Sequence, residues 1–268
     1  MSSLIRTEWL KLKKYRAFWW MTGLVALAYP GINYMFYQGA YKEQLDNKDF
    51  GPILKMLPNP FTFPEVWHTV AYISSFFLFI PSVVVIMFIT NEYTYKTHRQ
   101  NIIDGWSRKQ FMIAKMTDVL LVSLLVTILY TLVAIIIGSV AGESTGSAWE
   151  ETKYIALFFL QTFSQLSLAF LVAFLVRKAF IALGIFLFYF FPFEPIIVEI
   201  AKHKWNDIGR FMPLEISDRI ISFPRFMIRR QEDWDHAVSQ MNIHVVYTII
   251  LIGITWGLCF WLNSKRDL

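Results

Sequence analysis

Runs of about 20 apolar residues recur along the 268-residue chain and constrain its fold more than any motif does. A helix of roughly 20 residues crosses the ~30 Å hydrocarbon core of a bilayer, where the backbone must satisfy its own hydrogen bonds. Hydrophobic residues make up 56% of the chain, and the 17% that are charged concentrate between the runs, because a charge at mid-bilayer is costly. The sequence therefore predicts an all-α, polytopic membrane protein in which 1–268 form a single transmembrane domain.

Six membrane spans account for the apolar runs. We place them at 17–37, 70–90, 117–141, 153–176, 179–200 and 243–262. The first run is long, rich in bulky aromatics and without a small-x-small cleavage pattern, which favours a membrane helix over a secretory signal peptide. An even number of spans puts both termini on one side of the membrane.

Prolines divide several of these spans. We expect an interruption at Pro30-Gly31 and a kink at Pro81, which a membrane helix tolerates when neighbours satisfy the freed carbonyl. Pro192 and Pro195 flank Glu194 and should break the fifth span, leaving 196–200 as a separate re-entrant or interfacial piece. Between spans one and two, the proline-punctuated segment 41–64 is typical of an external loop with only short structure.

Lysine and arginine counts set the orientation. Residues 2–16 carry five basic residues around an apolar stripe, typical of an amphipathic helix in the membrane interface, and 91–116 carry five more. The first two external loops hold only four, so both termini and 91–116 should be cytoplasmic. Segment 201–242 argues against this with seven basic residues, but it also holds six acidic ones. We place it outside, where it could include re-entrant helices, and we attribute the net charge of +5 to topology rather than to nucleic-acid binding.

The stretch between spans two and three has the signals of an elbow. Residues 92–103 can form a helix, Asp104-Gly105 is a turn signal, and Ser107 with Gln110 makes a capping box that restarts a helix into the third span. From these residues alone, a solvated loop that only satisfies the positive-inside rule remains an alternative.

A family resemblance enters at these residues. Glu92, then Thr97-His98-Arg99-Gln100, Asp104-Gly105-Trp106-Ser107-Arg108, Phe111 and Lys115 resemble a pattern found after the second membrane helix in permease subunits of type-2 ATP-binding-cassette transporters. The six-span layout, the basic helix before the first span and the segment 210–215 after the fifth span are similar to that family as well.

The resemblance implies a permease subunit without ATPase chemistry of its own. In that family 91–112 would be the coupling helix, which docks on a separate nucleotide-binding subunit that binds ATP and Mg. A second permease copy, or a relative of it, would complete an exporter in the bacterial plasma membrane. The coupling role carries over to Glu92, Thr97, Arg99, Gln100, Asp104, Gly105, Ser107 and Arg108. Within this set, Arg99 and Arg108 are candidates for contacts with acidic partner residues, and no Walker motif occurs in the chain.

Motifs for other chemistry are weak. Gly142–Gly146 matches G-x-S-x-G, but it joins two membrane helices instead of a strand and a helix, which argues against an esterase. The five histidines show no metal-ligand spacing, and Cys259 is the one cysteine, so neither a metal site nor a disulfide framework is expected.

Polar side chains within the spans form two stripes. Ser123, Thr127 and Thr131 share one face of the third span, and Gln161, Ser164 and Gln165 share one face of the fourth. Such stripes either bond helices together, which we favour, or line a pathway.

Two acids adjoin the broken fifth span near the outer interface. Glu194 and Glu199 could bind a cationic group, with plain solvation as the favoured alternative. The scarcity of charges in the spans favours an apolar or amphipathic substrate such as a lipid, a peptide or a drug. A secondary transporter, a membrane anchor without transport and a membrane-embedded enzyme stay open as rival functions.

Overall fold

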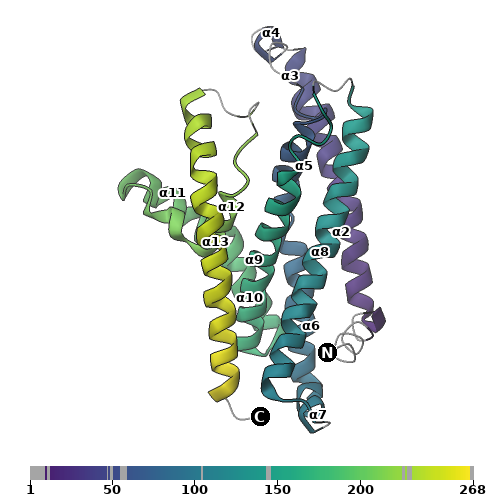
Figure 1. Ribbon diagram of the computed structural model, residues 1–268, viewed down its shortest axis with the longest axis vertical. Coiled ribbons are helices and arrows are strands. Elements are labelled where there is room, and N and C mark those ends of the chain that lie inside the picture. The colour runs from purple at the N-terminus through teal and green to yellow at the C-terminus, as the bar shows by residue number, and fades with distance from the viewer. Residues whose placement is uncertain are drawn as a thin grey trace.

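The fold is a bundle of long helices standing side by side (Figure 1). The structure, a computed structural model, describes residues 10, 13–46, 48, 51–54, 59–103, 105–142, 146–224, 227 and 231–265, and every regular element within these ranges is helical. Ten of the fifteen residues of the expected interfacial helix at 2–16 fall outside these ranges, as do Asp104 and three residues of the G-x-S-x-G match. The all-α prediction is confirmed.

Helix α9 (Lys153–Val176) is the centre of the bundle. It contacts α5 (Val66–Ser75), α6 (Phe79–Thr94), α8 (Arg108–Val140), α10 (Ala179–Phe188) and α13 (Gln231–Lys265). Helix α2 (Arg16–Met35) packs on α8, α6 and α5 at the edge of the bundle. One continuous core of buried apolar side chains runs through these helices.

In the part of the chain that the structure describes, four helical segments are long and apolar enough to cross a membrane, and a bent pair makes a fifth candidate. The four are 108–140, 153–176, 179–204 and 234–265, and the pair is α5 with α6. These segments match five of the six spans in order, although α8 begins earlier than 117 and α13 begins earlier than 243. The chain is therefore a multi-pass membrane protein.

Prolines act differently from our expectation in the first two spans. Helix α2 continues through Pro30 and leads into a π-helix, Phe36–Lys42, so the predicted interruption is wrong. A proline removes one hydrogen bond, and the packing of α2 on three neighbours offsets that loss. The bend in the second span is real and measures 50°, but it lies between Ser75 and Phe79. Pro81 stands in the first turn of α6, where no backbone donor is needed.

The fifth span stays helical where we predicted a break. After α10 the chain forms a π-helix, Tyr189–Phe193, and then α11 (Glu194–Lys204). The wider π turn accommodates Pro192, and Pro195 lies in the first turn of α11. The prediction of a separate piece at 196–200 is therefore wrong.

The long segment after the fifth span folds back against the bundle (Figure 1). A 3-10 helix, Ile208–Phe211, leads to the short helix α12 (Pro213–Asp218), which contacts both α9 and α13. The loop after α2 contains the short helices α3 (Glu43–Leu45) and α4 (Gly51–Leu54), as expected for this segment. Helix α7 (Thr97–Ile103) marks the end of the bundle opposite to α3 and α4, together with the last turn of α13.

Candidate functional site

Helix α7 forms an elbow between α6 and α8. The chain leaves α6 through Lys96, whose φ of 57° is left-handed, and turns again at Gly105, whose φ is 97°. Glycine suits the second corner because it has no Cβ to strain at positive φ. The predicted helix over 92–103 is thus interrupted at Lys96.

The restart of the helix after the elbow is as predicted. The Ser107 hydroxyl accepts the Gln110 backbone N–H at 3.2 Å, and the Gln110 side chain accepts the Ser107 backbone N–H at 2.8 Å. This reciprocal capping box satisfies two of the donors that open α8. It fixes the direction in which α8 leaves the elbow.

A buried ionic triad locks the root of the elbow. The Lys115 ammonium donates to Glu92 Oε1 at 2.8 Å and to Asp118 Oδ2 at 3.0 Å, with the lysine side chain 1% exposed and the glutamate 6% exposed. The same ammonium lies 4.9 Å from the Phe88 ring centroid and 5.6 Å from that of Phe111. Separating such a pair would leave an uncompensated buried charge, so α6 and α8 are held in one register. Glu92 is therefore buried in the root of the elbow, where it stabilises the junction of α6 with α8.

The inner surface of the elbow rests on the end of α6. The Thr97 hydroxyl donates to the Glu92 carbonyl at 3.4 Å, and His98 Nδ1 lies 3.2 Å from the same oxygen. The Arg177 guanidinium, in the two-residue turn between α9 and α10, lies 4.8 Å from the Tyr93 ring centroid. That tight turn, with Arg177 at a φ of 59°, is as expected.

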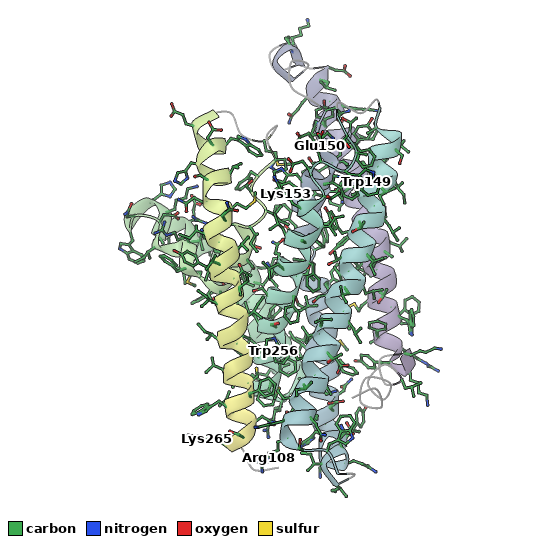
Figure 2. All side chains as sticks on the ribbon, viewed as in Figure 1. Arg108, Trp149, Glu150, Lys153, Trp256 and Lys265 are labelled. Atoms are coloured by element: carbon green, nitrogen blue, oxygen red, sulfur yellow. The ribbon has the colours of Figure 1, made fainter. Side chains whose placement is uncertain are left out.

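Two further contacts join the elbow to distant helices. Arg108 Nη1 donates to the Ser264 carbonyl at 2.9 Å, and Asn263 Nδ2 donates to the Arg108 carbonyl at 2.8 Å. Figure 2 shows Arg108 beside the last turn of α13, at the opposite end of the molecule from Trp149. Asn91 Nδ2 donates to the Tyr15 hydroxyl at 2.9 Å, which connects the elbow to the residue before α2. Arg108 thus contacts α13, which sequence reasoning did not anticipate.

The outer surface of the elbow carries exposed side chains. Ile103 is 84% exposed, Tyr95 is 74% exposed, and Gln100 and Ser107 are exposed as well. The Arg99 side chain lies outside the described part. Of the residues that the resemblance identified, Gln100 and Ser107 face outward while Glu92 and Arg108 hold the elbow to the bundle.

The polar stripe of α9 binds helix α12. Gln161 Nε2 and Gln165 Nε2 both donate to Asp218 Oδ1, at 2.8 and 2.6 Å, and Gln165 Nε2 lies 3.3 Å from the Ser217 hydroxyl. Ser164, on the same face of α9, is 1% exposed, and its hydroxyl has no partner in the ranges that the structure describes. The stripe therefore attaches segment 205–224, which contains the 3-10 helix and α12 and is called the α12 hairpin below, to α9.

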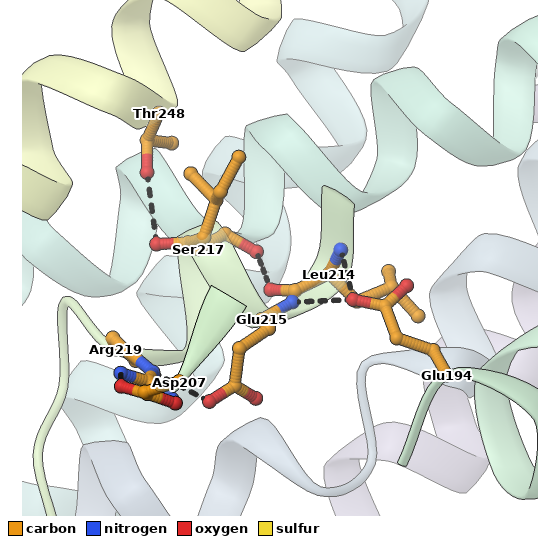
Figure 3. Close-up of polar contacts among 8 residues, drawn as sticks. Glu194, Asp207, Leu214, Glu215, Ser217, Arg219 and Thr248 are labelled. Atoms are coloured by element: carbon orange, nitrogen blue, oxygen red, sulfur yellow. Dashed lines mark hydrogen bonds and ion pairs between the residues drawn. The ribbon is translucent and has the colours of Figure 1, made fainter. Parts of the chain in front are cut away.

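Glu194 caps helix α12 across the fold. Its Oε1 accepts the backbone N–H groups of Leu214 and Glu215, both at 2.7 Å, and its side chain is buried (Figure 3). A carboxylate there satisfies donors that α12 cannot satisfy itself and complements the helix dipole. Plain solvation of Glu194 is thus wrong, because the hairpin covers it; Glu199 is exposed as expected.

An ion-pair network fixes the base of the same hairpin. Arg219 donates to both carboxylate oxygens of Asp207, at 2.5 and 2.8 Å, and to Glu215 Oε1 at 2.6 Å (Figure 3). The hydrogen bond from Arg219 is the main reason that the pKa of Asp207 lies below its ordinary value. The Thr248 hydroxyl, on α13, lies 3.4 Å from the Ile216 carbonyl of α12.

The stripe on α8 has a local role. The hydroxyls of Ser123, Thr127 and Thr131 each donate to the carbonyl four residues earlier in the same helix, at 2.8 Å. These bonds satisfy the hydroxyl donors without a second helix. The three residues do not meet the elbow or the α12 hairpin.

Sequence reasoning assigned no structural role to several residues that organise these two sites. Lys115 and Asp118 were visible as opposite charges three residues apart at the start of an apolar run, where an unpaired charge would be costly. Asp218 gave no signal, because its partners Gln161 and Gln165 lie more than 50 residues away in sequence. Within the described residues, no group of three His, Cys, Asp or Glu side chains could hold a metal ion.

Comparison with known proteins now assigns the family. The family model described as "ABC-2 family transporter protein" matches residues 4–193, which include the elbow and all but the last two of the long helical segments. No curated protein matches the sequence. The match covers most of the chain and agrees with the order of its apolar helices, so the chain belongs to the ABC-2 transporter family, as a membrane permease component.

Proposed function

We propose that this chain is the permease subunit of an ATP-driven exporter in a bacterial plasma membrane, with α2 completing a set of six spans. Both termini and the elbow face the cytoplasm. A separate nucleotide-binding subunit binds ATP and Mg and docks on the elbow, which acts as the coupling helix, and a second permease copy or relative completes the pathway. The substrate is amphipathic or apolar: a lipid, a peptide or a drug.

The observation that carries this proposal is the contrast between the two sides of the elbow. Its outer side presents the exposed apolar side chains of Ile103 and Tyr95 at an end of the bundle, where a soluble partner can cover them. Its root is fixed by the buried contacts of Lys115 with Glu92 and Asp118. A movement of the ATPase subunit against the outer side of the elbow would therefore displace α6 and α8 together as a rigid body.

Co-purification tests the docking. The full chain is expressed in its native host with an affinity tag, together with its untagged ATPase subunit, and the amount of ATPase subunit recovered is quantified. Ile103→Glu combined with Tyr95→Glu should reduce recovery by at least about tenfold, because charges replace an apolar contact of roughly 1.4 kcal/mol or more. Trp149→Glu, an equally exposed aromatic at the other end of the bundle, serves as the matched control and should leave recovery unchanged.

Two results would count against the proposal. Recovery of the ATPase subunit with the double variant at the wild-type level would show that the elbow is not the docking element. Absence of any ATPase subunit from the wild-type preparation would remove the basis for an ATP-driven permease.

A further inference from the structure

Asp218 places a carboxylate at the depth of the membrane helices. Its partners Gln161 and Gln165 lie eight and twelve residues after the start of α9, or about 12 and 18 Å along a helix that rises 1.5 Å per residue. Part of the Asp218 side chain nevertheless stays accessible, in contrast to the buried glutamines that hold it. The carboxylate can therefore be reached by a ligand at this depth.

No cation in the described part of the chain neutralises this carboxylate. Its hydrogen-bond donors are two neutral amides, and the neighbouring Arg219 is already bonded to Asp207 and Glu215. A charged side chain inside a membrane is expensive unless it meets water or an opposite charge. The accessible side of Asp218 therefore suits a polar or cationic occupant.

The surroundings of Asp218 favour a donor as that occupant. The carbonyl oxygens of Gln161 and Gln165 and the hydroxyl of Ser164 are buried, and in the described ranges none of these oxygens has a hydrogen-bond partner. All three residues lie on the face of α9 that meets α12. These oxygens add acceptors, and no positive charge, to the environment of the carboxylate.

An aromatic cluster centred on Tyr72 lies near the same carboxylate. Tyr72 on α5 lies within electrostatic range of Asp218 and Glu215, and its ring centroid is 5.2 Å from those of Phe76 and Phe223. The two phenylalanine side chains are more than half exposed. Ring faces attract organic cations and also bury apolar groups, so carboxylate and rings together suit a cation with an apolar body.

We propose that Asp218, held by Gln161 and Gln165 and close to Tyr72, on which Phe76 and Phe223 pack, binds the cationic group of an amphipathic organic cation. The inference rests on the proposed export function and narrows its substrate class. The carboxylate pairs with the positive charge, the rings contact the apolar body, and Glu194 and Arg219 keep α12 in place.

A pair of ions of equal size and opposite charge tests this site. The permease with its ATPase subunit is placed in lipid nanodiscs, and binding of tetraphenylphosphonium and tetraphenylborate is measured by equilibrium dialysis, with empty nanodiscs subtracted. Wild type should bind the cation in preference to the anion. Asp218→Asn, which keeps the shape of the side chain, should weaken cation binding by at least about tenfold, a typical loss for a charge-assisted contact. Glu199→Gln removes an exposed acid from α11 and should leave binding unchanged.

The outcomes separate this inference from the proposed function. Equal binding of both ions, or cation binding unaffected by Asp218→Asn, overturns the site even when the complex is intact and hydrolyses ATP. If Asp218→Asn loses the permease dimer on size-exclusion chromatography but still binds the cation, Asp218 faces a second copy. That result would also overturn the inference. Failure to form any complex with the ATPase subunit would instead refute the proposed function, since cation binding is measured on the assembled complex.

Discussion

At the scale of single residues, the buried triad of Lys115, Glu92 and Asp118 is the feature whose substitution should change stability most. One ammonium serves two carboxylates with almost no access to solvent. Removing the lysine takes away the cation that both buried carboxylates contact, whereas neutralising the carboxylates as well removes the charges that it paired. The loss of folding stability from each substitution therefore depends on which buried charges remain.

Lys115→Met should destabilise the protein by about 3–5 kcal/mol, the usual cost of breaking a buried ion pair from one side. The triple variant with Glu92→Gln and Asp118→Asn should recover most of that loss. Thermal unfolding of the detergent-solubilised chain measures both. A triple variant no more stable than Lys115→Met would show that the charges do not oppose each other there.

Asp207 gives a pH prediction with a defined sign. Its pKa is held below the ordinary aspartate value by the hydrogen bond from Arg219, so the folded state binds that proton less readily than the unfolded state. The contribution is present at neutral pH and is lost as the pH falls below about 4, through the lowered pKa. Hydrogen exchange of 208–224 should accelerate over that range, and Asp207→Asn should abolish the pH dependence that arises from this pair. If exchange of 208–224 in Asp207→Asn depends on pH as it does in wild type, the pH dependence does not arise from the pair of Asp207 and Arg219.

At the scale of elements, the corners of the elbow depend on backbone conformation. Gly105 has no other atom near the position of a Cβ, so a side chain there meets no clash and only the positive φ opposes it. Lys96 adopts a comparable φ although it is not glycine. The two positions form a natural pair for comparison.

Gly105→Ala should destabilise the elbow by about 1–2 kcal/mol, the cost of left-handed backbone for an L-residue. Lys96→Gly should change stability by less than about 0.5 kcal/mol, because relief of strain is offset by greater freedom in the unfolded chain. Hydrogen exchange of α7 in the purified permease reports both effects. Faster exchange in Lys96→Gly than in Gly105→Ala would contradict the conformational argument.

Helix α12 is too short to be stable alone and depends on Glu194. Glu194→Ala removes two hydrogen bonds from its first turn, so exchange of the Leu214 and Glu215 amides should accelerate by roughly tenfold or more, for about 1.5–3 kcal/mol. Glu199→Ala, on the same α11 but exposed, should leave these amides unchanged. Protected amides in Glu194→Ala would show that packing alone holds α12.

At the scale of the whole molecule, the proposed orientation can be read with single cysteines. The native Cys259 is fully buried and should not react. Trp149→Cys should react with a membrane-impermeant maleimide in intact cells, and Ile103→Cys only after the membrane is opened. The reverse pattern would invert the topology.

The sequence predicted the large features better than the local ones. Apolar runs predict helices because lipid leaves the backbone no alternative, and the capping box at Ser107 is a local signal that the structure confirms. The prolines misled because a π turn at Tyr189–Phe193 and tertiary packing around Pro30 absorb them. The α12 hairpin was beyond reach, since Asp218 finds its partners more than 50 residues away.

The central place of α9 sets an order for assembly during synthesis. Its neighbours α5, α6 and α8 come earlier in the chain, so they are synthesised before the helix on which they pack. When α9 arrives, Gln161 and Gln165 still lack Asp218, which the ribosome makes 57 and 53 residues later. The two amides of the half-made protein therefore stay without this acceptor until α12 has folded against α9.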